Sequence, residues 1–292
     1  MSDVILLLMT GLGLGALYFL IAGGLSLIYG LMGVLNFAHG SFLTVGAIAG
    51  WEISKLLGGD SWGVLLISMV VGALVGAVVA TATELLLIRP LYLRHIEQAL
   101  ITVGLSLASV ALFEGIWGVD PNYVSRPPWL IEVTKIAGAL VPNDRFLLIG
   151  SAVLVLFGML AFLRYTRFGL IIRAGVENRA MVQALGIDVR RAFTLVFAIG
   201  GAVAGFGGVL ASQYFGYVSP HLGGNLLIFA FIVTIIGGLG SLVGAAIASV
   251  LVAVLQQFAN FYLGGTGDLV IVVLLIVVLL TRPTGLLGKR AH

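Results

Sequence analysis

Cysteine is absent from the 292 residues, and charged side chains make up only 9% of them. The missing cysteine excludes disulfides and thiol chemistry. The scarcity of charge excludes an ordinary soluble domain, in which about a quarter of the residues are charged. The sequence also lacks an HExxH metal motif and a GxxxxGK[ST] phosphate-binding loop. We therefore expect no enzyme, no cofactor and no ATP hydrolysis by this chain itself.

Hydrophobic residues, in contrast, make up 60% of the chain, and apolar blocks long enough to cross a bilayer follow one another along it. The sequence predicts a single all-α polytopic membrane domain over residues 1–292, with eight or nine spans. The first block has no basic residues before it, so we expect a retained span rather than a cleaved signal peptide. The predicted spans are Val4–Gly30, Phe42–Leu57, Gly63–Ile88, Ala99–Gly118, Phe146–Leu163, Ala192–Tyr214, a run from Leu226, Leu242–Leu263 and Leu269–Leu280.

Two glycine-rich interruptions divide this pattern, at Gly30–Phe42 and at Gly237–Ser241. The 41 glycines of the chain favour close helix packing and broken helices. Each interruption precedes a helix of small residues, and they occur at similar distances into the two halves. They indicate either an internal repeat, as transporters often have, or a chance recurrence of glycine clusters. If one interruption is re-entrant, the span count changes.

Charge predicts the orientation, because basic residues concentrate in cytoplasmic loops. Alternate crossings give an external N-terminus and a cytoplasmic C-terminus. The segment 119–145, with mixed charge and prolines, is then an external loop, and 164–191 a cytoplasmic one. Eleven of the fifteen basic residues fall on the cytoplasmic side: Arg89, Arg94, Arg164, Arg167, Arg173, Arg179, Arg190, Arg191, Arg282, Lys289 and Arg290.

The segment 164–191 holds six of these arginines between two apolar spans. Within it, Glu177–Leu185 consists of good helix formers, and Gly186 suits a left-handed C-cap. On a helical wheel Glu177, Met181 and Ala184 or Leu185 share one side. A helix of about nine residues is unstable alone in water, so it must pack either on this chain's own bundle or on another protein.

Few polar residues lie inside the predicted spans, and such residues often mark function. Asn36 and His39 in the first interruption either shape a solute pathway or satisfy backbone groups that the break frees. Glu84 lies close to Arg89 and is expected to pair with it or to reach the inner interface. No relay of buried acids, as a proton-driven pump requires, is visible. The pathway candidates are Asn36, His39, Ser41, Gln98, Thr102 and Gln213, with Asn225 as a further one.

Four stretches together support a resemblance to a known family. They are LSLIYGLMGVLNFAHGSF (Leu25–Phe42), RAGVENRAMVQALGIDVRR (Arg173–Arg191), GGAVAGFGGVLASQYFGYVSP (Gly200–Pro220) and TIIGGLGSLVGAAI (Thr234–Ile247). The chain resembles the permease of the branched-chain amino acid ABC importer family over nearly its whole length. The resemblance implies a multi-pass subunit of the bacterial inner membrane. Its implied partners are a second, related permease, two cytoplasmic ATP-binding subunits and a periplasmic substrate-binding protein.

The resemblance also implies that the short helix in 164–191 is the coupling helix that docks on the ATP-binding subunit. Glu177, Met181, Ala184, Leu185 and Gly186 would then form the docking surface. The sequence departs from the Glu-Ala-Ala…Gly pattern of importers, because Asn178 and Arg179 follow Glu177.

The substrate does not follow from the resemblance, because members of this family serve branched-chain amino acids, other amino acids, urea, amides or aromatic acids. Branched-chain amino acids are the default expectation. A self-sufficient channel or ion-coupled carrier is the main alternative, and an intramembrane enzyme lacks a matching set of residues. The net charge of +3 gives no reason to expect a nucleic-acid partner.

Overall fold

A computed structural model describes residues 2–33, 35–92, 94–177, 181–182, 186 and 189–288. It confirms an all-α polytopic membrane protein, since each of the nine predicted apolar segments forms a helix. Six helices are long and apolar enough to cross a membrane. These are α1 (Ser2–Met32), α3 (Trp62–Thr83) with its extension to Leu91, α4 (His95–Trp117), α6 (Asp144–Tyr165), α9 (Val189–Phe215) and α11 (Leu242–Tyr262).

Three further apolar helices are shorter: α2 (His39–Leu56), α10 (Leu222–Gly237) and α12 (Gly267–Thr281). They contain 18, 16 and 15 residues. At 1.5 Å per residue these lengths correspond to about 22 to 27 Å, less than the roughly 30 Å of the hydrocarbon core. The shorter helices therefore depend on the irregular segments beside them to complete a crossing.

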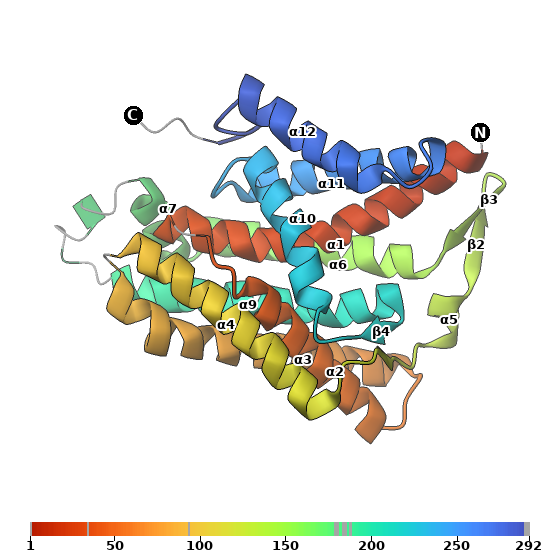
Figure 1. The fold of residues 1–292 in the computed structure, drawn as a ribbon, viewed down its shortest axis with the longest axis horizontal. Helices are drawn as coiled ribbons and strands as arrows, with labels where there is room; N and C mark the ends of the chain where they lie inside the picture. Colours follow the sequence, from red (N-terminus) through yellow and green to blue (C-terminus); the bar gives the residue numbers. More distant parts are fainter. Residues whose placement is uncertain are drawn as a thin grey trace.

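The two ends of the bundle differ in structure (Figure 1). The N-terminus lies at the same end as the small elements α5 (Pro128–Ile131), β2 (Val133–Ile136) and β3 (Ala139–Pro142), whereas α7 (Arg167–Glu177) lies at the opposite end. Both predicted interruptions are present, and they lie side by side: a Cβ on Gly30 would lie 3.1 Å from the Cα of Gly240. The first break is narrower than predicted, because α1 continues to Met32 and α2 begins at His39.

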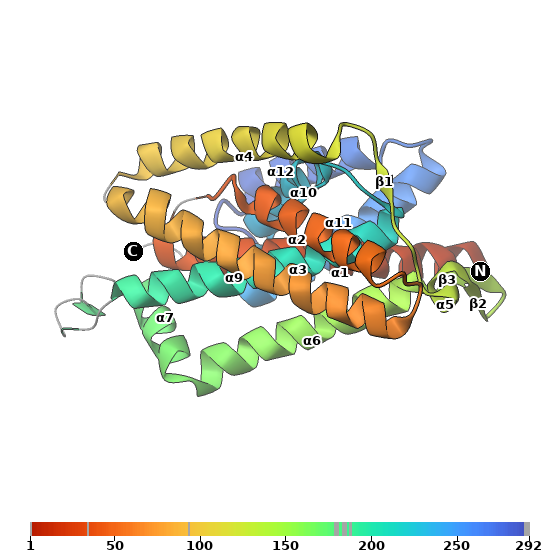
Figure 2. The same cartoon turned by 90° about the horizontal axis from the view of Figure 1, so that it is seen from below.

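The centre of the bundle is α9, which packs on α1, α2 and α3 (Figure 2). Glycine makes this packing close enough for backbone contact. A Cβ on Gly205 would lie 2.1 Å from the carbonyl oxygen of Gly72 in α3, and a Cβ on Gly46 in α2 would lie 2.3 Å from the Cα of Gly205. Small residues allow helix backbones to approach in this way inside a membrane. Helices α2, α3 and α9 consequently form one closely packed unit.

The N-termini of α2 and α10 meet within the bundle. The backbone N–H of Gly223 donates to Thr44 Oγ1 at 2.9 Å. A Cβ on Gly40 would lie 2.7 Å from the carbonyl oxygen of Gly223. This contact satisfies one of the amides that the start of every helix leaves without an intrahelical partner. It also joins the helix after the first break to the second half of the chain.

The segment 119–145 contains more structure than the sequence predicted. Strands β2 and β3 form an antiparallel hairpin with Val133 opposite Pro142 and Ile136 opposite Ala139. Ala137 and Gly138 both have positive φ, as a two-residue hairpin turn requires. Strand β1 (Asn122–Tyr123) pairs with β4 (Tyr217–Val218) after α9. Asp144 and Arg145, placed in the loop by the sequence, instead begin α6.

Substituting Gly205 by alanine tests the backbone contact. We expect Gly205→Ala to destabilise the protein by about 1 to 3 kcal/mol or more, because the new methyl group forces α9 away from α3. Gly158→Ala in α6 is the matched control, since no atom of the described residues lies within 4 Å of its Cβ position. Thermal unfolding in detergent measures the difference, and equal midpoints for the two variants would contradict this account of the core.

Candidate functional site: two polar cavities and a buried carboxylate cluster

The break between α1 and α2 is held by side chains that satisfy its backbone. Asn36 Oδ1 accepts a hydrogen bond from the Ala38 amide at 3.1 Å. Thr102 Oγ1 in α4 accepts one from the Phe37 amide at 3.2 Å and donates to the Ala99 carbonyl oxygen. An unpaired amide in lipid costs several kcal/mol, so these two acceptors permit the chain to leave the helix here. Asn36 and Thr102 thus satisfy backbone amides that the break leaves without a helical partner.

Asn36, Gln98 and Thr102 also line one cavity, which the sequence could not show. Its internal volume is about 10 Å³, room for one water molecule, and Met32, Leu35 and Ile88 complete the nearby wall. Gln98 Nε2 donates to the Leu91 carbonyl oxygen at 2.5 Å. Within the described part of the chain, Gln98 Oε1 and Asn36 Nδ2 have no hydrogen-bond partner. We call this space the break cavity.

His39 and Ser41 are buried in α2 but do not line the break cavity. The side chain of His39 is fully buried, and its Nε2 lies 3.1 Å from the carbonyl oxygen of Ile21 in α1. This contact fixes the start of α2 against α1. Asn225, the further candidate, is exposed near the start of α10. The structure therefore places these three residues outside the lining of the break cavity.

Gln213 lies in a second polar cavity, near the other end of α2. Its internal volume is also about 10 Å³. Gln213 and Ser212 enter it from α9, Ser68 from α3, and Trp51 and Ser54 from α2. Gln213 Oε1 and Ser68 Oγ are buried and have no partner among the described residues. We call this space the outer cavity. The segment beyond β1 contributes Val124, Ser125 and Pro127 to its wall.

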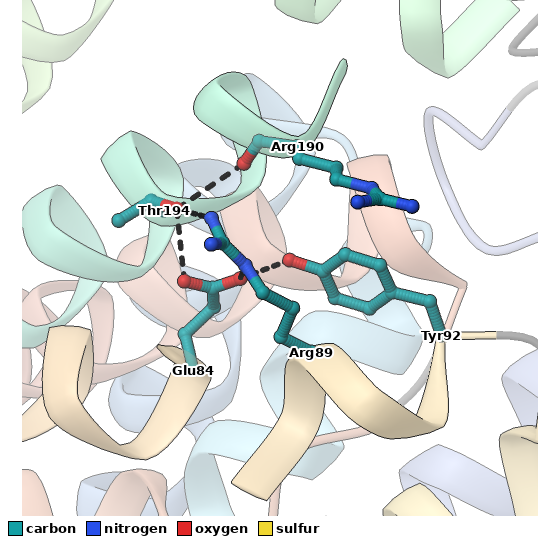
Figure 3. A network of polar contacts seen from close by, with 5 residues as sticks. All are labelled: Glu84, Arg89, Tyr92, Arg190 and Thr194. Carbon is teal, nitrogen blue, oxygen red and sulfur yellow. Dashed lines mark hydrogen bonds and ion pairs between the residues drawn. The ribbon is translucent and has the colours of Figure 1, made fainter. Parts of the chain in front are cut away.

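A buried carboxylate cluster lies close to the break cavity (Figure 3). Glu84 is fully buried in η1 (Glu84–Ile88), a π-helical turn that follows α3 and leads into the 3₁₀ turn η2 (Arg89–Leu91). Glu84 Oε1 accepts from the Tyr92 hydroxyl and lies 3.5 Å from Arg89 Nε. Glu84 Oε2 accepts from Thr194 Oγ1 at 2.8 Å. Burial raises the pKa of the Tyr92 hydroxyl, so it remains a neutral donor to the carboxylate.

The sequence showed only part of this cluster. The short separation of Glu84 and Arg89 predicted that Glu84 either pairs with Arg89 or reaches the inner interface, and the structure shows the pairing. Pro90 explains why the regular helix ends here, since proline cannot donate a backbone hydrogen bond and crowds the preceding turn. Thr194 lies 110 residues from Glu84, and no local pattern could connect them.

The predicted docking residues fall partly within the described chain. Glu177 ends α7, a helix that the sequence did not predict. Met181 is helical and 61% exposed, while Val182 beside it is buried. Gly186 has a φ of +76°, the left-handed conformation expected of a C-cap. Ala184 and Leu185 lie outside the described residues, so the helix over Glu177–Leu185 stays a prediction.

The Thr102 hydroxyl can be tested as the acceptor that holds the break. We expect Thr102→Val to destabilise the protein by about 1 to 3 kcal/mol, because the partly buried Phe37 amide loses its partner. Thr102→Ser keeps the hydroxyl and should retain most of the stability. Thermal unfolding of the purified variants measures this order, and a valine variant as stable as the serine variant would refute the assignment.

Comparison with known proteins identifies the family to which this chain belongs. Residues 7–280 match the family described as branched-chain amino acid transport system / permease component. The LivH permease protein of the high-affinity branched-chain amino acid transport system of Salmonella typhimurium is 31% identical, with 96% of this chain and 94% of LivH aligned. The LivM permease protein of that system is 27% identical over 93% of this chain and 68% of LivM. A fructose import permease protein, FruF of Bifidobacterium longum, is 27% identical over 86% of this chain and 69% of its own length. The chain belongs to the family of branched-chain amino acid transport permease components.

Proposed function

We propose that this chain is the membrane-spanning subunit of an ATP-driven importer that carries branched-chain amino acids or a related small solute inward. A periplasmic binding protein delivers the solute, and two cytoplasmic ATP-binding subunits supply the energy. The observation that carries the proposal is the family match over residues 7–280, in a chain whose first crossing breaks beside a polar cavity. The sequence contains no phosphate-binding loop, so ATP hydrolysis falls to partner subunits.

A second permease completes the membrane part of this assembly. In Salmonella typhimurium, LivH and LivM both carry the name of permease proteins of one transport system, and both are similar to this chain. Two related permeases pairing about a common axis would provide the second half of the solute pathway. The membrane in question is the bacterial inner membrane.

The orientation follows from charge and from the two ends of the bundle. We place 164–191 and the C-terminus in the cytoplasm, with the N-terminus and 119–145 outside. The end that carries α7 holds most of the arginines, which favours the cytoplasmic side. The opposite end carries the hairpin β2–β3 and the acids Asp120 and Glu132. Residues Val124, Ser125 and Pro127 of this external segment form part of the wall of the outer cavity.

The solute pathway runs beside α2 in this proposal. Asn36 lies at its start, facing the break cavity, and Trp51 and Ser54 near its end face the outer cavity. Both cavities hold buried polar atoms that have no partner among the described residues. Broken helices near the substrate path are a recurring feature of transporters. His39 and Ser41 lie on α2 between the two cavities and support the pathway by holding that helix in place.

Branched-chain amino acids are the proposed solute because LivH, 31% identical, carries that substrate in its name. The similarity to FruF, named for fructose, shows that related chains are assigned chemically different solutes. Urea, amides and aromatic acids therefore remain the alternatives for uptake assays. Competition for leucine uptake by each of these solutes would rank them.

Reversing the charge of Glu177 tests the docking surface. We expect Glu177→Arg to insert normally but to lose the copurifying ATP-binding subunits and solute uptake, because the exchange places an arginine against the partner. Glu132→Arg, an exposed position in the external segment, is the matched control. Affinity purification with mass spectrometry, together with leucine uptake in cells, gives both readouts.

Normal uptake by Glu177→Arg would argue against this docking role. Leucine flux through the chain alone in liposomes, without ATP-binding subunits, would instead support a self-sufficient channel or carrier and contradict the proposed function.

Two buried glutamines distinguish a pathway role from a structural one. Gln213→Leu should lower leucine uptake by about fivefold or more while leaving stability nearly unchanged, because Gln213 Oε1 has no partner to lose within the described chain. Gln256→Leu should instead lower stability, since Gln256 accepts from Tyr18 at 2.8 Å and donates to Asp268 at 2.7 Å. Uptake and thermal unfolding are measured on both variants. Reduced stability with unimpaired uptake in Gln213→Leu would remove Gln213 from the pathway.

A further inference from the structure

Glu84 is a carboxylate that the proposed pathway does not use, yet it is fully buried within a membrane span. An isolated charge in such a place is costly, and here it is compensated by Arg89, Tyr92 and Thr194. Buried charge clusters contribute little net stability compared with well-packed apolar side chains. The cluster therefore calls for an explanation other than stability alone.

Thr194 connects this cluster to the end of the cytoplasmic segment. It lies in the second turn of α9, which begins at Val189, where the segment 164–191 returns to the membrane. Thr194 donates to Glu84 Oε2 at 2.8 Å and accepts from an Arg89 terminal nitrogen at 3.2 Å. The ring of Tyr92 packs edge-on against Phe193, with 4.8 Å between the ring centroids. Figure 3 shows that the first turns of α9 and the exit of α3 face each other across these side chains.

The cluster connects in the other direction to the break cavity. Ile88, at the end of the π-helical turn, lines that cavity together with Gln98. The Leu91 carbonyl oxygen, one residue before Tyr92, accepts from Gln98 Nε2 at 2.5 Å. One turn further along α4, Thr102 holds the Phe37 amide at the start of α2. A continuous series of contacts thus leads from the first turns of α9 to the break.

The turn between these contacts has a geometry that can rearrange. Single π-helical turns such as η1 occur often at functional sites, and the 3₁₀ turn η2 that follows has poorer hydrogen-bond geometry than an α-helix. Pro90 prevents the regular α-helix from continuing through it. We propose that Glu84 is a positioning residue: through Thr194 it transmits movement of the cytoplasmic segment 164–191 to the break cavity. This inference rests on the proposed function, because the movement is supplied by the docked ATP-binding subunits.

The test uses the absence of cysteine from this chain. Met32→Cys introduces a single thiol whose side chain lines the break cavity. The chain is reconstituted in nanodiscs with its partner permease and ATP-binding subunits. The labelling rate with a small maleimide is then measured with ADP and with ATP plus vanadate. We expect the two rates to differ by about fivefold or more.

Thr194→Val, which has nearly the same shape without the hydroxyl, should abolish this difference while ATP hydrolysis continues. Thr194→Ser should restore it. Thr234→Val in α10 is the control, because the Thr234 hydroxyl bonds only to the Ala230 carbonyl oxygen of its own helix among the described contacts. Glu84→Gln combined with Thr194→Val should add little to either change alone, since both act on one contact.

Each outcome tests either the role of Glu84 or the proposed function on which that role rests. A nucleotide-dependent difference that survives Thr194→Val would overturn the role of Glu84 and leave ATP-driven import intact. Release of the ATP-binding subunits by Thr194→Val would also overturn it, since Thr194 would then serve docking. Leucine flux through the chain without ATP-binding subunits would overturn the proposed function itself.

Discussion

The hydrogen-bonding demand of the backbone in lipid is the constraint on which this structure depends. A helix can stop inside a bilayer only where other groups take over the amides that it leaves unpaired. At the first break, Asn36 accepts a hydrogen bond from the Ala38 amide, and Thr102 accepts one from the Phe37 amide. Where α2 meets α10, Thr44 accepts a hydrogen bond from the Gly223 amide. At these three amides the backbone is thus bound to a side chain from another part of the sequence or from the break itself, and the break cavity lies beside Asn36 and Thr102.

Glycine supplies the second requirement, which is close approach. Gly46, Gly72 and Gly205 bring the backbones of α2, α3 and α9 into direct contact. Such contact leaves little freedom for these three helices to slide past one another. Movement within the bundle is more readily accommodated where regular structure is interrupted, at the break after α1 and at the π-helical turn after α3. These are also the two places where buried polar groups collect.

Several features were predictable from the sequence for physical reasons. The apolar blocks predicted the nine apolar helices of the described chain, because a bilayer requires long apolar runs. Glycine clusters predicted both interruptions, and the closeness of Glu84 to Arg89 offered their pairing as one of two alternatives. The remaining features depend on distant parts of the chain. The bond from Thr194 to Glu84 spans 110 residues, and the grouping of Asn36 with Gln98 depends on how α4 packs. The helix α7 was missed although Arg167–Glu177 has a pronounced amphipathic pattern. The hairpin β2–β3 was missed because short strands in a polar segment carry weak periodic signals.

The exposure of α4 gives the break cavity an unexpected neighbour. Only 11% of the apolar stretch of α4 is buried inside the bundle. This helix nevertheless contributes Gln98 to the wall of the cavity and the Thr102 hydroxyl to the break. The other side of this helix faces whatever surrounds the chain, including lipid. The side of α4 that enters the bundle therefore joins the surroundings of the chain to its polar interior, so a neighbour that packs on α4 lies one helix away from the break.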